Sequence, residues 1–125
     1  MNFPAELKYT KSHEWVKDLG NGLFEIGLSD YAQNELGDIV YVNLPKAGDQ
    51  VKAGEPFADV ESVKAVSNIY CPVNGTVREV NEAVLSAPES INKAPYETWL
   101  IRAEGSVTDG QLLSAVEYEE VVRSL

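Results

Sequence analysis

The amino-acid sequence predicts a mainly β fold, a small sandwich or flattened barrel of short antiparallel strands. Its 125 residues, 44% of them hydrophobic, suit one domain with a buried core. Short runs of β-branched and aromatic residues, bounded by Gly, Pro or Asp, recur through the middle of the chain. The gaps between these runs are too short for the helices that connect parallel strands. We therefore expect the strands to be mainly antiparallel.

The elements follow from local patterns taken in chain order. Residues 29–37 predict one short helix, with Asp30 as its cap, Gln33 three residues later and Gly37 as its stop. Residues 83–95 contain two prolines and no sustained period, so they predict an irregular segment. Apolar residues recur at helical spacing near the end and predict a helix over about 111–124. Strands are expected at 23–28, 38–43, 51–55, 56–61, 67–70, 75–80 and 98–102.

Charge and hydropathy narrow the classes of function. Ten basic and twenty acidic side chains give a net charge of −10, which argues against binding nucleic acid or an anionic membrane through a basic surface. The longest apolar runs are far too short to cross a bilayer. The first residues show neither a secretory nor a transit pattern, so we expect a cytoplasmic protein. The charge is compatible with a monomer, which we also expect.

Conventional enzyme and metal-binding patterns are missing from the sequence. His13 is the single histidine, Cys71 is the single cysteine, and no serine stands in a Gly-x-Ser-x-Gly motif. No glycine-rich phosphate loop is present either. Cys71 is expected to be a small buried hydrophobic residue rather than a nucleophile. We therefore expect no catalytic residues and no metal site in this chain.

Residues 59–68 are the most informative segment. Both flanks alternate like strands, and the centre is short enough to be a β-turn that points Lys64 into water. A lysine held tightly at a turn is what a modifying enzyme needs in order to acylate one amine among several. On composition alone, an ordinary surface lysine is the simpler interpretation.

The surrounding residues resemble the lipoyl-attachment hairpin of the H proteins of the glycine cleavage system. The hairpin motif is Glu61-Ser62-Val63-Lys64-Ala65, and Gly75 follows the lysine by 75 − 64 = 11 residues, as in that family. The resemblance spans about residues 7–102 and continues more loosely to the end. It is also carried by 12–16, 37–42, 44–45, 80–81 and the series Pro88, Ile91, Asn92, Pro95, Tyr96 and Trp99.

This resemblance implies one lipoyl-carrier domain over 1–125, folded as a lipoyl/biotinyl-type flattened antiparallel β-barrel, or barrel-sandwich hybrid. Lys64 would carry lipoate in amide linkage. In the family, the lipoyl arm takes an aminomethyl group from the glycine decarboxylase (P protein) and passes it to the aminomethyltransferase (T protein). Dihydrolipoyl dehydrogenase (L protein) then reoxidises the arm. The carrier catalyses none of these steps, because the cofactor supplies the sulfur chemistry.

The resemblance also implies how Lys64 is recognised and presented. Glu61 would guide the modifying enzyme, a lipoate ligase or an octanoyltransferase followed by lipoyl synthase. Val63 and Ala65 would set the presentation of the lysine. Gly75 would fit either a turn with positive φ or a close approach of two strands, and would act on the lysine only indirectly.

A pocket for the loaded arm is the last implied feature. Glu14 would hold the cationic amine by a charge-assisted hydrogen bond, with His13 and Asn68 nearby. For His13 a packing role is the alternative. The family often has Asp where this chain has Asn68, so one anionic partner for the amine is missing.

Two other functions remain open at the level of sequence. An H-like protein could instead relay lipoyl or octanoyl groups to other lipoyl domains, with the same fold and the same lysine. A small acidic β-domain could also serve only as a protein-binding module, with Lys64 never modified.

Overall fold

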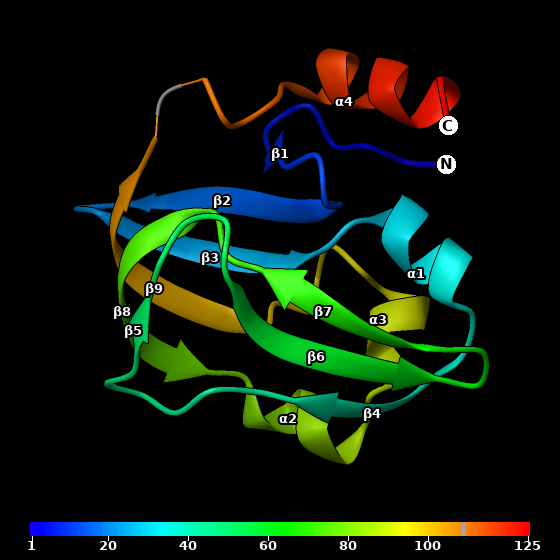
Figure 1. Ribbon diagram of the computed structural model, residues 1–125, viewed down its shortest axis with the longest axis horizontal. Helices are drawn as coiled ribbons and strands as arrows, with labels where there is room; N and C mark the ends of the chain where they lie inside the picture. Colours follow the sequence, from blue (N-terminus) through cyan, green and yellow to red (C-terminus); the bar gives the residue numbers. More distant parts are fainter. Residues whose placement is uncertain (109) are drawn as a thin grey trace.

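Two antiparallel β-sheets with short helices around them make up the protein (Figure 1). The computed structural model describes residues 1–108 and 110–125. The predicted mainly β architecture is confirmed. The strands are β1 (Lys8–Tyr9), β2 (Glu14–Gly20), β3 (Leu23–Leu28), β4 (Ile39–Asn43), β5 (Gln50–Val51), β6 (Pro56–Ser62), β7 (Val66–Tyr70), β8 (Val73–Val80) and β9 (Ile101–Val107). The helices are α1 (Asp30–Leu36), α2 (Glu82–Ser86), α3 (Ser90–Lys93) and α4 (Ala115–Arg123).

The larger sheet has the strand order β1-β2-β3-β9-β8-β5, and the smaller sheet has the order β4-β6-β7. Among the described residues every strand pair is antiparallel, as the short connections predict. In the larger sheet β9 lies between β3 and β8, although it is the last strand in the sequence. The β6–β7 hairpin ends in the turn that carries Lys64, at the same end of the molecule as α1 and α3 (Figure 1).

Alternating apolar side chains build the core. The smaller sheet contributes Ile39, Val42, Val60 and Ile69, which pack with Leu100 and with residues of α1, α2 and α3. Each large side chain buried in this way contributes about 1.5–3 kcal/mol. A second cluster lies against the larger sheet, and a third lies beneath α4 and contains Leu7, Tyr9, Trp15 and Tyr118.

The helix expected at 29–37 is present, but its cap differs from the prediction. Ser29, not Asp30, is the N-cap, because its side-chain oxygen accepts the backbone N–H of Ala32. Asp30 is the first helical residue. The predicted stop at Gly37 is confirmed, and Gly37 has a φ of 76°.

The C-terminal helix is shorter than the predicted 111–124. It spans Ala115–Arg123 because Ser114 and Glu117 form a capping box at its start. Just before it, Leu113 pairs with Tyr9 through two backbone hydrogen bonds of 2.9 and 2.7 Å. Because the backbone N–H and carbonyl of Leu113 both bond to Tyr9, this residue is not available for the hydrogen bonds of the helix.

Other boundaries also differ from the sequence predictions. The segment 51–55 is not one strand, because a turn at Gly54, with a φ of 86°, follows the two residues of β5. The segment 83–95 is not irregular throughout, since it contains α2 and α3. The strand expected at 98–102 begins at Ile101 and continues to Val107, and the sequence patterns did not predict β1 and β2 as strands.

Candidate functional site

Lys64 lies in a tight turn between β6 and β7 that Ser62 organises. The backbone N–H of Ser62 donates to the carbonyl oxygen of Ala65 at 2.8 Å. The hydroxyl oxygen of Ser62 accepts the backbone N–H groups of Lys64 at 3.2 Å and of Ala65 at 3.1 Å. Serine is well suited to such turns, because its hydroxyl satisfies backbone donors locally. The sequence analysis gave Ser62 no role, although its place two residues before the lysine is a recognisable turn signal.

The side chain of Lys64 is exposed. Within residues 1–108 and 110–125, its ammonium group makes no hydrogen bond or ion pair with the rest of the chain. Its neighbours Glu61, Val63 and Ala65 are exposed as well, with Val63 at 67%. Glu61 lies on β6 opposite Val66 of β7. An amine so placed can be reached by a second protein without any change in the fold.

The three residues predicted to form a pocket line one cavity. This cavity of about 150 Å³ contains Glu14, His13 and Asn68 in its lining, and we call it the α1–β7 cavity. The remaining lining residues mix apolar and polar side chains and come from α1, β3, β6, β7 and the segment before β2: Ser12, Leu28, Tyr31, Ala32, Glu35, Leu36, Val60, Ser67 and Ile69. Asn68 follows Lys64 by four residues, and three of these lie along β7, so the lysine turn and the cavity are roughly 13 Å apart along the strand.

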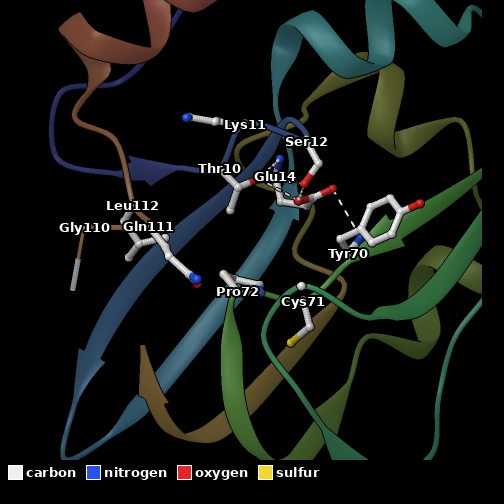
Figure 2. Close-up of a pocket in the computed structure, with 11 residues that line it drawn as sticks. Thr10, Lys11, Ser12, Glu14, Tyr70, Cys71, Pro72, Gly110, Gln111 and Leu112 are labelled. Atoms are coloured by element: carbon white, nitrogen blue, oxygen red, sulfur yellow. Dashed lines mark hydrogen bonds between the residues drawn. The ribbon is translucent and has the colours of Figure 1, made fainter. Parts of the chain in front are cut away.

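Glu14 is a buried carboxyl group with three hydrogen-bond donors around it (Figure 2). The hydroxyls of Thr10 and Ser12 each donate to its Oε1 at 2.6 Å, and the backbone N–H of Tyr70 donates to Oε2 at 3.3 Å. Its side chain is 1% exposed, and this burial raises its pKa above the ordinary value. The three donors oppose that shift by favouring the charged form.

His13 packs against Tyr31 and Tyr118 and also lines the α1–β7 cavity. Its Nδ1 shares a hydrogen bond of 2.9 Å with the hydroxyl of Tyr118, and that hydroxyl shares another of 2.7 Å with Ser29. The ring lies 4.8 Å from the ring of Tyr31. Burial lowers the pKa of His13, while the nearby carboxylate of Glu35 opposes this shift.

Asn68 is exposed on β7, opposite Asp59 of β6. Tyr31 and Glu35 of α1, which the sequence did not single out, also line this cavity, and the hydroxyl of Tyr31 donates to the carboxylate of Glu35 at 3.0 Å. Their spacing of four residues on a predicted helix places them on one face, which is the signal that could have identified them. Glu35 thus contributes a carboxylate to this cavity, in which residue 68 is Asn and carries no charge.

Gly75 lies inside β8 and not in a turn. It is opposite Gly105 of β9, and among the described glycines it is not one with positive φ. A Cβ atom at Gly75 would overlap the carbonyl oxygen of Glu104, and one at Gly105 would overlap that of Asn74. The turn interpretation of Gly75 is therefore wrong, and the close approach of two strands is correct.

Glu14 also lines a second cavity, of about 270 Å³ (Figure 2). It is lined by Lys11, Tyr70, Cys71 and Pro72, among others. Cys71 is buried, and burial raises the pKa of its thiol to about 11. The thiol is therefore protonated at neutral pH and is not a nucleophile, as the sequence predicts. It lies between β7 and β8 rather than within a strand.

Neither a membrane-spanning helix nor a metal-binding cluster is found in the described part of the chain. No helix there has the length and apolar character needed to cross a bilayer. No group of three or more His, Cys, Asp and Glu side chains in residues 1–108 and 110–125 is placed to hold a metal ion.

Comparison with known proteins gives one consistent family. The sequence model of the family described as "Glycine cleavage H-protein" matches residues 7–125. The chain is 53% identical over 123 residues to the glycine cleavage system H protein of Lachnoclostridium phytofermentans, covering 98% of this chain and 97% of that protein. It is 52% identical over 124 residues to that of Halalkalibacterium halodurans, with coverage of 97% and 96%.

A solved structure agrees with these relatives. The crystal structure of a glycine cleavage system H protein from Mycobacterium marinum matches with a TM-score of 0.89 and 36% identity, over 98% of this chain and 99% of that chain. The resemblance seen in the sequence is thereby confirmed. The chain belongs to the glycine cleavage H-protein family, whose members are non-catalytic lipoyl carriers that shuttle an aminomethyl group within the glycine cleavage system.

Proposed function

We propose that Lys64 is the lysine that carries lipoate in this chain. The observation that carries the proposal is an exposed amine, without a partner in the described residues, at a turn that Ser62 holds rigid. The family carries lipoyl-lysine, and the arm supplies the redox and sulfur chemistry once it is attached. Glu61, Val63 and Ala65 surround the amine on the exposed side of the turn and supply the surface by which a modifying enzyme recognises it.

Residues 1–125 then form one lipoyl-carrier domain. The two sheets are the two halves of a lipoyl/biotinyl-type flattened barrel, a barrel-sandwich hybrid. The packing of Leu28 from the larger sheet with Val60 and Ile69 from the smaller sheet supports this assignment. Gly75 acts on Lys64 only through the fold.

The α1–β7 cavity is proposed to shelter the loaded end of the arm. Leu28, Ala32, Leu36, Val60 and Ile69 supply its apolar part, and the carboxyl group of Glu14 is placed to hold a cationic amine by a charge-assisted hydrogen bond. Asn68 offers an amide in place of a second charge. Glu35 provides the second carboxylate, and His13 closes the same wall with its neutral ring.

The partners follow from the system to which the family belongs: the P, T and L proteins, that is, the decarboxylase, the aminomethyltransferase and dihydrolipoyl dehydrogenase. A lipoate ligase, or an octanoyltransferase with lipoyl synthase, would modify Lys64. We propose that the chain works as a monomer, since its net charge of −10 opposes self-association. The cytoplasmic location inferred from the first residues stays a prediction.

Intact-mass measurement followed by peptide mapping tests the attachment site. The protein is coexpressed with a lipoate ligase and lipoate, beside the variants Lys64→Arg and Lys52→Arg. Lys52 is a second exposed lysine and serves as the matched control. We expect one lipoyl group on the wild-type chain and on Lys52→Arg, and none on Lys64→Arg. An unmodified wild-type chain, with a control lipoyl domain fully modified in the same cells, would instead favour the protein-binding module.

Reconstitution separates the shuttle from a lipoate relay. We expect the lipoylated chain to support exchange of carbon dioxide with glycine by the decarboxylase. Lipoylated protein that supports no exchange, yet donates its group to other lipoyl domains, would favour the relay.

A further inference from the structure

The lysine turn is anchored to the segment that connects α1 to β4. Val63, directly before Lys64, donates its backbone N–H to the carbonyl oxygen of Asp38 at 3.0 Å. Ser62 also pairs with Ile39, the first residue of β4. Both contacts lie outside the β6–β7 hairpin itself. The direction in which the turn presents Lys64 therefore depends on where residues 37–39 lie.

Asn92 of α3 fixes that segment on both sides of Asp38. Its Oδ1 accepts the backbone N–H of Ile39 at 2.9 Å, and its Nδ2 donates to the carbonyl oxygen of Gly37 at 2.8 Å. The second hydrogen of the amide is used as well, since Nδ2 donates to the side-chain oxygen of Gln33 at 3.1 Å. One amide side chain thus ties α1, the connection and β4 together. Neither Asp nor Ser could make all three bonds, because neither has an NH₂ group.

Gly37 forms the surface over which the lysine side chain runs. Its φ of 76° and ψ of −160° lie in a region that only glycine adopts readily. An added Cβ atom would be 3.2 Å from Cε and 3.7 Å from Cδ of Lys64. The preceding residue, Leu36, lines the α1–β7 cavity. A lysine lying on the bare backbone of Gly37 is thus directed toward the α1 wall of that cavity.

We infer that Asn92 and Gly37 are positioning residues for Lys64. Asn92 holds the 37–39 segment that anchors the turn, and Gly37 leaves the path from the turn to the cavity free of a side chain. The inference rests on the proposed function, in which Lys64 bears the arm and the cavity shelters its end.

The role of Asn92 is tested by NMR on the unmodified full-length chain. We expect Asn92→Ala to speed hydrogen exchange of the Val63 amide about tenfold, because the lost bonds to Ile39 and Gly37 no longer hold its acceptor in place. The nuclear Overhauser contact between the Lys64 Hε and Gly37 Hα protons should weaken in parallel. Exchange of the core amides of Val60 and Ile69 reports global stability in the same sample.

Asn81→Ala is the matched control for this variant. Asn81 also donates its side-chain amide to a backbone carbonyl, that of Trp99, at 2.7 Å. It should leave Val63 exchange and the Lys64–Gly37 contact at their wild-type values. Should Asn92→Ala unfold, Asn92→Asp replaces it, since it keeps the acceptor for Ile39 and loses only the donors. Equal Val63 exchange in the Asn92 variant and in the control would overturn the inference for Asn92.

Gly37→Ala tests the path of the side chain, with Gly48→Ala as its control. Gly48 also has positive φ, 97°, but an added Cβ there meets nothing within 4 Å. We expect Gly37→Ala alone to abolish the Lys64–residue 37 contact and to lower kcat for lipoylation about tenfold at unchanged KM. A preserved contact and an unchanged kcat would overturn the inference for Gly37. Failure of the wild-type chain to be lipoylated at Lys64 would instead refute the proposed function, and the NMR results would still decide the positioning role.

Discussion

At Glu14, burial and hydrogen bonding act on one carboxyl group in opposite directions. Burial is the larger effect and raises the pKa above the ordinary 4.5. The folded state therefore binds this proton more tightly than the unfolded state does. The stabilisation that results is fully present below about pH 4.5 and is lost as the pH rises through the folded pKa.

Glu14→Gln removes this titration, so its stability relative to the wild type should rise between about pH 4 and about pH 7. Urea denaturation at the two pH values measures the difference. Glu120→Gln, at an exposed site on α4, is the control for the loss of one carboxyl group. A constant difference between Glu14→Gln and the wild type would mean that the carboxyl group titrates normally in the folded protein.

The thiol of Cys71 provides a second test at the residue scale. Because it is buried with a pKa raised to about 11, Ellman's reagent at about pH 8 should modify it far more slowly in the native protein than in denaturant. Absorbance after mixing gives both rates. Equal rates would show that the thiol is open to solvent.

At the scale of elements, β8 and β9 lie so close at Gly75 and Gly105 that a Cβ atom on either residue would overlap the backbone of the other strand. Gly75→Ala should destabilise the protein by about 3 kcal/mol, since the added methyl group must push aside the backbone of Glu104. Thr76→Ala, on the next residue, loses one hydrogen bond from Gln50 and should cost only about 1 kcal/mol. Denaturant titration of both variants measures the two costs, and equal values would show that the strands can separate at this point.

The elements that sequence predicted best are those set by local chemistry. The strand at 23–28 and the stop of α1 at Gly37 depend on residues that are adjacent in the chain. The final helix starts late for a reason outside that stretch, because Leu113 pairs with Tyr9 far away in the sequence. The N-cap error is local, since Ser29 and Asp30 are adjacent and both residue types commonly cap helices.

The residues of the candidate site also divide into those that local sequence predicts and those that depend on distant contacts. The exposure of Lys64 could be predicted from a short alternating motif, and the cavity around Glu14 followed from the family resemblance. The roles of Asn92 and Glu35 could not be predicted. Each depends on a helix docking beside residues far away in the sequence, and no local pattern records that contact.

At the scale of the whole molecule, Tyr118 joins the last helix to the cavity wall. Its ring stacks on Tyr9 at 4.7 Å, and its hydroxyl contacts His13 and Ser29, the cap of α1. Tyr118→Phe keeps the stacking and removes the hydroxyl contacts. We expect a loss of about 1–2 kcal/mol in the free energy of unfolding.

Denaturation of Tyr118→Phe measures that loss, and Tyr41→Phe, at a site that is 53% exposed, is the control. Unchanged stability of Tyr118→Phe would mean that the hydroxyl contributes no net energy to holding α4. In that case the apolar packing around the stacked rings attaches the helix.

The place of β9 in the larger sheet sets an order of events during synthesis. All strands of the smaller sheet lie within residues 39–70, so they leave the ribosome before Val84, Ile91 and Leu100, which cover the buried face of that sheet. β3 and β8 must wait for residues 101–107 to come between them. The β6–β7 hairpin that carries Lys64 is therefore synthesised before Asn92. In the positioning inferred above, the direction of the lysine side chain is set only after Asn92 has bonded to Gly37 and Ile39.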